Sequence, residues 1–125
     1  MSGDKPKVLV VEDEDAVGKL LTEQLKELGY EAFRTSNAVS ALAKLGEGGF
    51  KLVLTDLRLP GMSGLDLLRQ VRPRYPGIPV IVLTAVDDVP TAVEVMKAGA
   101  FDYIVKPFSL ANVNRSIIRA LQGAK

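Results

Sequence analysis

Two kinds of apolar segment alternate along this chain, and the alternation constrains the fold more than any other feature. Short runs rich in Val, Leu and Ile are typical of buried strands. They occur at residues 7–11, 51–55 and 79–84, with weaker candidates at 31–35 and 101–105. The segments between them have the apolar spacing of helices. Because right-handed crossovers return the chain to the same end of the sheet, we predict an α/β fold, a doubly wound five-stranded parallel sheet of order 2-1-3-4-5 with helices on both faces.

The predicted helices have recognisable stripes and ends. The first ends at Gly29, a residue favoured just after a helix, and its apolar stripe is Val17, Leu20, Leu21, Leu25 and Leu28. Three later helices should begin at N-cap residues, whose side chains accept hydrogen bonds from free backbone N–H groups. These helices would cover about residues 38–46, 88–98 and 109–122, opened by Asn37, by Asp87 or Asp88, and by Ser109.

Composition limits the kinds of function that the chain can have. Its 125 residues suit one domain, 1–125, and the 16 basic and 15 acidic residues leave a net charge of +1, which gives no reason to expect nucleic acid or a membrane as partner. Cysteine and histidine are absent, so a bound metal should be hard and held by oxygen. Residues 1–7 lack an apolar signal core, and no stretch approaches the roughly 20 apolar residues of a membrane span, so a cytoplasmic location is expected.

Polar residues gather where the predicted strands end. The first strand ends in Glu12 and Asp13 and the third in Asp56, whereas the second, ending near Thr35 and Ser36, offers nothing comparable. In an open α/β sheet the carboxyl ends of the strands form the functional crevice, and the first and third strands are neighbours. Three carboxylates so close would repel one another, so either some are protonated or a cation lies among them; for a cation, Mg²⁺ is the first choice before Mn²⁺ or Ca²⁺.

Two further residues at this edge suit a phosphoryl group. The fourth strand ends in Thr84, and Lys106 follows the fifth. Neither is needed to bind a metal, but both can hold phosphoryl oxygens through hydrogen bonds. A metal beside Asp56 would reduce its repulsion of an incoming phosphate, which makes Asp56 a candidate nucleophile that forms an acyl phosphate.

Four segments at these strand ends carry a family resemblance: "VVEDE", "LTDLRLPGMSG", "VIVLTA" and "DYIVKPF". With all four in order, the chain resembles a receiver domain of bacterial two-component response regulators over residues 6–122. The resemblance implies a flavodoxin-like fold and a phosphorelay switch rather than an enzyme. It also implies that an output domain, if any, lies outside this chain. The segment "TAVEVMKAGAFDYIVKPF" is similar to receivers of sigma-54-dependent transcription activators.

The resemblance also assigns roles to single residues. It implies Asp56 as phosphoacceptor, Thr84 and Lys106 as phosphate contacts, and Glu12, Asp13, Asp56 and the backbone carbonyl of Arg58 as Mg²⁺ ligands. Position 12 departs from the family's commoner aspartate, which bears on metal affinity.

A conformational switch and its partners are implied in the same way. Phosphorylation would draw Thr84 toward the phosphoryl group and Tyr103 inward, and so re-form the surface of the fourth helix, fifth strand and fifth helix. The resemblance further implies a cis peptide before Pro107. The expected partners are a histidine kinase, an output domain or effector protein, and a second copy of the chain on phosphorylation.

One prediction concerns the partner surface. Val89, Val93 and Met96 share the predicted core stripe of the fourth helix, whereas Val95 lies off it. Ile118 lies at the margin of the stripe on the fifth helix. We hypothesise that Val95 and Ile118 contribute to a dimer or output interface, although scattered exposed apolar residues are common.

Two other functions fit parts of the pattern. An aspartyl-phosphate phosphatase would also use Asp56 as nucleophile, but it needs a general acid two residues later, where this chain has Arg58. A flavodoxin-like cofactor module would need hydroxyls and amides after the first strand, where this chain has the acidic "EDEDAVG". Both rank below the receiver.

Overall fold

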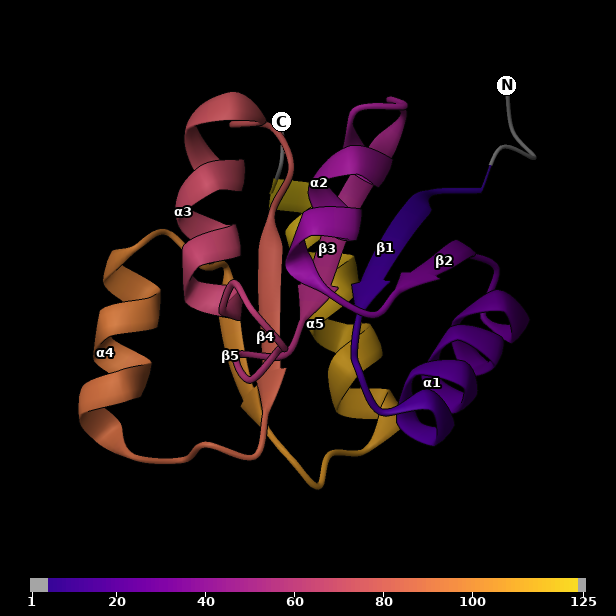
Figure 1. The fold of residues 1–125 in the computed structure, drawn as a ribbon. Coiled ribbons are helices and arrows are strands. Elements are labelled where there is room, and N and C mark those ends of the chain that lie inside the picture. The colour runs from indigo at the N-terminus through magenta and orange to yellow at the C-terminus, as the bar shows by residue number, and fades with distance from the viewer. Residues whose placement is uncertain (1–4, 124–125) are drawn as a thin grey trace.

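A parallel sheet of five strands, in the order β2-β1-β3-β4-β5, forms the centre of the protein in this computed structural model, which describes residues 5–123 (Figure 1). The elements in chain order are β1 (Lys7–Val11), α1 (Asp15–Glu27), β2 (Glu31–Thr35), α2 (Ala38–Leu45), β3 (Phe50–Thr55), α3 (Gly64–Arg74), β4 (Val80–Thr84), α4 (Val89–Lys97), β5 (Asp102–Val105) and α5 (Leu110–Gly123). The predicted fold class and strand order are confirmed.

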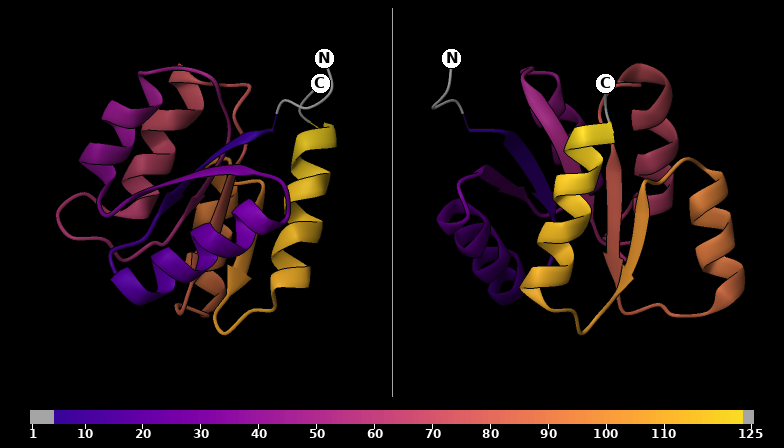
Figure 2. Two further views of the ribbon diagram at one scale, coloured as in Figure 1. Left: turned by 90° about the vertical axis from the view of Figure 1, so that its right-hand side faces the viewer. Right: turned by 180° about the vertical axis from the view of Figure 1, so that it is seen from behind.

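Helices cover both faces of the sheet, because the alternating side chains of each strand point to opposite sides. In Figure 2, α2 and α3 lie on one side and α1 and α5 on the other. Val8 and Val10 of β1 pack in the cluster that includes α1 and α5, whereas Leu9 and Val11 pack in the cluster that includes α2 and α3. Within residues 5–123 no helix has the length and apolar character needed to cross a bilayer.

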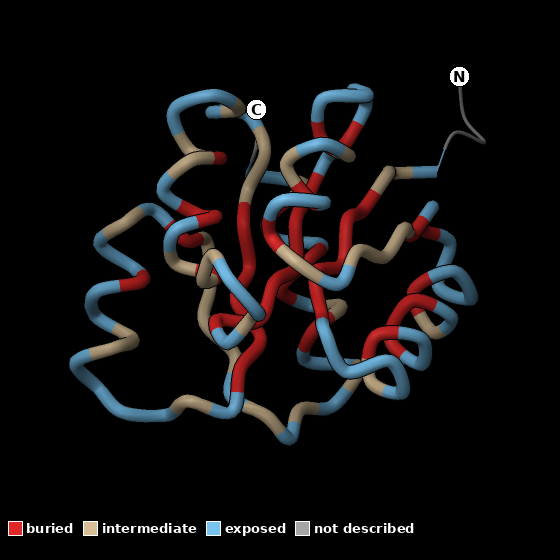
Figure 3. The backbone as a smooth tube through the Cα atoms, viewed as in Figure 1, coloured by how far each residue is buried: buried red, intermediate tan, exposed pale blue. Residues whose placement is uncertain are grey.

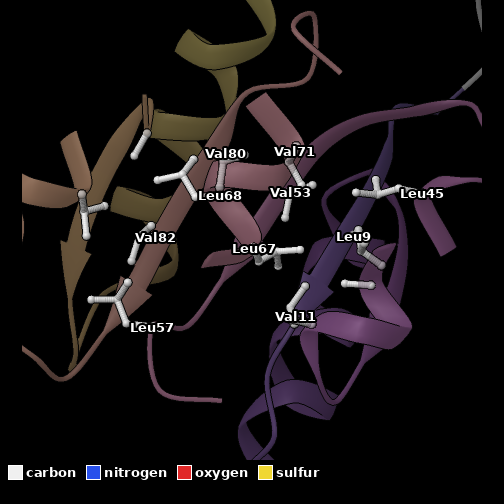
Figure 4. Packing of buried hydrophobic residues seen from close by; sticks show 14 of the residues in the cluster. Leu9, Val11, Leu45, Val53, Leu57, Leu67, Leu68, Val71, Val80 and Val82 are labelled. Atoms are coloured by element: carbon white, nitrogen blue, oxygen red, sulfur yellow. The ribbon is translucent and has the colours of Figure 1, made fainter. Parts of the chain in front are cut away.

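The central strands are buried on both faces, as Figure 3 shows by their colour. The cluster in Figure 4 joins Leu9 and Val53 of the sheet to Leu67 and Val71 of α3. Burying one such side chain stabilises the fold by about 1.5–3 kcal/mol. The ends of the central strands β1 and β3 are therefore anchored in the core, and so are the polar residues that directly follow them.

The expected N-caps open their helices. Side-chain oxygens of Asn37, Asp88 and Ser109 accept hydrogen bonds from the N–H groups of Ser40, Thr91 and Asn112 at 2.8, 2.8 and 3.1 Å. Hydrogen bonding to Thr91, first to its side chain and then to its backbone N–H, favours the carboxylate and so lowers the pKa of Asp88.

The predicted core face of α4 is wrong. Val95 is fully buried, whereas Val89, Val93 and Met96 are 72%, 45% and 43% exposed. The helix packs on the sheet through Val95 and small neighbours such as Ala98, and the larger apolar residues on the adjacent stripe face outward. The buried stripe and the exposed stripe both have helical spacing. Choosing the stripe with the larger apolar side chains as the core face therefore gave the wrong prediction.

The burial of Val95 contradicts one of the two residues that we proposed for a dimer or output interface. Val95 has no exposed surface for a partner, whereas Ile118 of α5 is exposed as expected. Leu20 of α1 and Leu28, which directly follows α1, are also exposed, although the predicted apolar stripe includes both.

Candidate functional site

The polar residues singled out above lie along the carboxyl edge of the sheet. The strand arrows in Figure 1 point to this edge at the bottom of the view. Parallel register places the ends of neighbouring strands level, with Val11 opposite Thr55 and Thr84 opposite Val105. Glu12 and Asp56 each follow the last residue of adjacent strands, so the sheet itself brings them together.

Lys106 joins the two acidic residues. Its Nζ lies 2.7 Å from Glu12 Oε1 and 2.9 Å from Asp56 Oδ2. The side chains of Lys106, Glu12 and Asp56 are only 17%, 5% and 10% exposed. One ammonium therefore pairs with two largely buried carboxylates, and the cluster keeps a net negative charge.

Two opposing effects act on the pKa of Lys106. Burial lowers the pKa, but the hydrogen bonds and charges of Glu12 and Asp56 together outweigh burial. The pKa therefore lies above the ordinary value for lysine, and the side chain is a permanent cation at neutral pH.

Backbone groups hold Asp56 from the other side. Its Oδ1 accepts a hydrogen bond from the N–H of Arg58 at 3.1 Å. The start of α3 packs directly against the Asp56 peptide, because a Cβ on Gly64 would lie 2.0 Å from the Asp56 carbonyl oxygen. Gly64 directly follows the N-cap Ser63, and sequence reasoning gave it no part in the site.

Thr84 and Tyr103 meet at one residue of the following loop. The Thr84 hydroxyl, which is fully buried, accepts a hydrogen bond from the N–H of Val86 at 3.3 Å. The Tyr103 hydroxyl donates to the carbonyl of Val86. Burial raises the pKa of Tyr103, and nearby carboxylates, chiefly Asp88, raise it further, so the hydroxyl remains a donor at neutral pH. The Lys106–Pro107 peptide is cis, as the resemblance implied.

The structure does not bring all the proposed metal ligands together. Asp13 and Arg58 are exposed, and between residues 5 and 123 no group of three or more acidic, His or Cys side chains is arranged to hold a metal ion. Lys106 instead occupies the space between Glu12 and Asp56. The donors at this edge are carboxylates and peptide carbonyls, which fit a hard cation such as Mg²⁺. The ligand assignment stays a prediction.

Sequence reasoning missed Arg34, because it gave the second strand no part in the site. The Arg34 guanidinium donates two hydrogen bonds to the carbonyl of Glu12. Every residue has a backbone carbonyl, so the sequence does not indicate which carbonyl a side chain will contact. This contact could therefore not be predicted directly. The available signal was Gly18, a glycine inside an amphipathic helix, which indicates that something large packs there.

The fold and this edge define a doubly wound α/β domain of flavodoxin-like order with a charged carboxyl edge. Comparison with known proteins identifies the family within this fold class. The model of the response regulator receiver domain family matches residues 8–118, and the chain belongs to that family. It is therefore a receiver domain of two-component response regulators, which is a regulatory domain.

Individual relatives agree with this family. The chain is 37% identical over 121 residues to the transcriptional regulatory protein ZraR of Klebsiella oxytoca, covering 97% of this chain and 27% of ZraR. It thus spans only part of the length of the curated relatives that it matches. A CheY-like receiver domain structure from Methanospirillum hungatei is 30% identical, with a TM-score of 0.92 and 97% of each chain covered. The beryllofluoride-activated NtrC4 receiver domain dimer is 30% identical, with a TM-score of 0.90, covering 95% of this chain and 98% of that one.

Proposed function

We propose that this receiver accepts a phosphoryl group from a separate histidine kinase onto Asp56. The observation that carries the proposal is the pair of contacts on the Asp56 carboxylate, an N–H on one oxygen and the Lys106 ammonium on the other. The 125 residues contain no histidine, so they cannot supply the phosphohistidine donor themselves. A carboxylate oxygen of Asp56 would bond to phosphorus while the P–N bond breaks, with its electron pair going to the donor's imidazole nitrogen.

The residues around Asp56 supply what this transfer needs. The Lys106 ammonium can pair with a phosphoryl oxygen once the group is attached, because its pKa keeps it charged. The hydroxyl of Thr84 can donate to a second oxygen after turning away from the Val86 N–H. Both groups act by positioning and charge, which is how phosphoryl transfer is catalysed in general.

A divalent cation completes the proposed chemistry. Glu12, Asp13, Asp56 and the backbone carbonyl of Arg58 would hold Mg²⁺, with Mn²⁺ as a substitute. When bound, the metal supplies positive charge against the phosphoryl oxygens. The net negative charge left on the cluster of Glu12, Asp56 and Lys106 attracts such a cation.

The proposed readout is a changed surface on α4, β5 and α5. Tyr103 is linked to Thr84 through Val86, so drawing Thr84 toward Asp56 would disturb the contact that holds Tyr103. The surface carries exposed apolar side chains that suit an effector or a second copy of the chain; they are Val89, Val93, Met96, Val105 and Ile118. The similar NtrC4 receiver forms a dimer when activated by beryllofluoride. The likeness to transcriptional regulators such as ZraR supports control of transcription, of the sigma-54-dependent type, as the output.

Intact-mass spectrometry tests the proposal. The chain is incubated with acetyl phosphate and Mg²⁺, beside D56N and a metal-free sample. We expect one added phosphoryl group on the wild-type chain and none in either control. An adduct that survives in D56N would contradict Asp56 as acceptor, and steady release of phosphate without an adduct would favour the phosphatase.

A further inference from the structure

The Arg34 side chain ties the acidic turn after β1 to the edge strand β2. Its Nε and Nη2 donate to the carbonyl oxygen of Glu12 at 3.0 and 2.6 Å, and its Nη1 lies 2.9 Å from Asp15 Oδ1. The N–H of Glu12 donates to the carbonyl of Thr35 at 3.1 Å. The peptide groups on both sides of Glu12 are therefore held by β2.

Gly18 of α1 makes room for this contact. A Cβ at position 18 would lie 2.3 Å from Arg34 Nε and 2.8 Å from its Cδ, so any other residue would displace the guanidinium. Glycine is unfavourable inside a helix, second only to proline, so its presence in α1 requires a reason. Space for Arg34 is that reason, and the two residues form a matched pair.

The contact with Glu12 matters more than the contact with Asp15. The Asp15 side chain is 93% exposed, and ion pairs in contact with water contribute little. The Glu12 carbonyl instead receives two charge-assisted hydrogen bonds in a partly buried place. Arg34 therefore acts on the backbone of the turn rather than on its charged side chains.

We propose that Arg34, with the space provided by Gly18, is a positioning residue for the cation site. Its two bonds fix the plane of the Glu12–Asp13 peptide and so set the direction in which Asp13 leaves the backbone. The inference rests on the proposed function, in which Glu12 and Asp13 hold the metal. The two possible roles of Arg34 predict opposite changes in Mg²⁺ affinity when Arg34 is removed. A positioning role predicts weaker binding. A role through charge alone predicts tighter binding, because the guanidinium repels the cation.

The test is a titration of the full chain with MgCl₂ alone, followed by ¹⁵N–¹H NMR. In R34M and in R34K we expect the affinity for Mg²⁺ to fall roughly tenfold, the lower end of the effect of removing groups that orient metal ligands. R72M is the matched control, because Arg72 also donates to a backbone carbonyl, that of Ile78, but at the amino end of β4. Its affinity should stay within about twofold of wild type, since Arg72 has no link to the ligands. Unchanged or tighter binding in R34M would overturn the proposal.

Gly18 provides a second test that leaves Arg34 in place. G18A should weaken Mg²⁺ binding when Arg34 is present, because the new methyl group displaces the guanidinium. In the R34M background it should have no further effect on affinity, because no guanidinium is left to displace. An equal loss of affinity in both backgrounds would mean that Gly18 acts through α1 itself and would overturn the pairing.

Acetyl phosphate labelling of the same variants separates this inference from the proposed function. If the wild-type chain binds Mg²⁺ and is labelled on Asp56 while R34M binds Mg²⁺ equally well, the positioning role fails and the proposed function stands. If the wild-type chain binds Mg²⁺ but is never labelled, and R34M binds Mg²⁺ more weakly, the phosphoacceptor role fails and the positioning role stands. If the wild-type chain does not bind Mg²⁺, both fail.

Discussion

At the scale of single residues, the cluster of Glu12, Asp56 and Lys106 contains two carboxylates and one ammonium. This imbalance affects the stability of the folded chain. Replacing Lys106 by Met would leave two buried carboxylates without a cation. We expect the free energy of unfolding to fall by about 3 kcal/mol, the lower end for breaking a buried pair, because the site is open to solvent on one side. Urea unfolding at pH 7 measures this loss.

The contribution of Lys106 should depend on pH in the direction set by its raised pKa. It is fully present below the ordinary lysine pKa of about 10.4 and is lost as the pH rises through the higher value of the folded state. The stability difference between wild type and K106M should therefore be constant from pH 7 to about 9.5 and shrink above it. A difference that shrinks already between pH 7 and 8 would contradict the raised pKa.

Removing a carboxylate from the same cluster should have the opposite effect. In D56N a single carboxylate, Glu12, pairs with Lys106, so the repulsion between two anions disappears. We expect unchanged or higher stability, by up to about 1 kcal/mol. Urea midpoints of the two variants, measured side by side, should lie on opposite sides of the wild-type value or D56N should coincide with it.

Among the glycines of residues 5–123, Gly64 leaves the least room for an added methyl group. G64A must push α3 away from the Asp56 carbonyl, and overpacking of this kind costs about 1–3 kcal/mol. Gly77 is the matched control, because a Cβ there meets no atom within 4 Å. G64A should lower both the urea midpoint and the rate of labelling by acetyl phosphate, whereas G77A should leave both near wild type.

At the scale of elements, α4 carries a narrow buried face and a broad apolar surface. V95A empties a fully buried position and should cost about 2 kcal/mol, whereas V93A, on the exposed stripe, should change stability by less than about 0.5 kcal/mol. Thermal and urea unfolding of the two variants measure the difference. Equal losses of stability in V95A and V93A would contradict the buried position of Val95 and the exposed position of Val93.

The sequence predicted where helices and strands occur better than it predicted which face of a helix is buried. Strands were predictable because β3 and β4 are buried on both sides and so are mostly apolar, with the exposed Lys51 near the start of β3 as an exception. The caps at Asn37 and Asp88 were predictable because capping is a local interaction. The buried face of α4 was not, because it depends on which side chains are small enough for close approach to the sheet.

At the scale of the whole molecule, parallel topology explains why most of the site was predictable. Glu12, Asp56, Thr84 and Lys106 lie far apart in the sequence, but all follow or end strands that terminate at one edge. The contacts of Lys106 with two carboxylates, and of Arg34 with a backbone carbonyl, depend on side-chain reach and packing, which the alternation of strands and helices does not encode.

The position of β5 at the border of the sheet has a further consequence. This strand is four residues long and pairs only with β4, yet it bears Tyr103 and leads directly to Lys106. Local opening of a border strand requires less free energy than opening of a strand paired on both sides, and amide hydrogen exchange measures that difference. Amides of β5 should therefore exchange with solvent deuterium well before those of β1 and β3, so the segment that carries the proposed signal is one of the two border strands, with β2, whose local opening requires the least free energy.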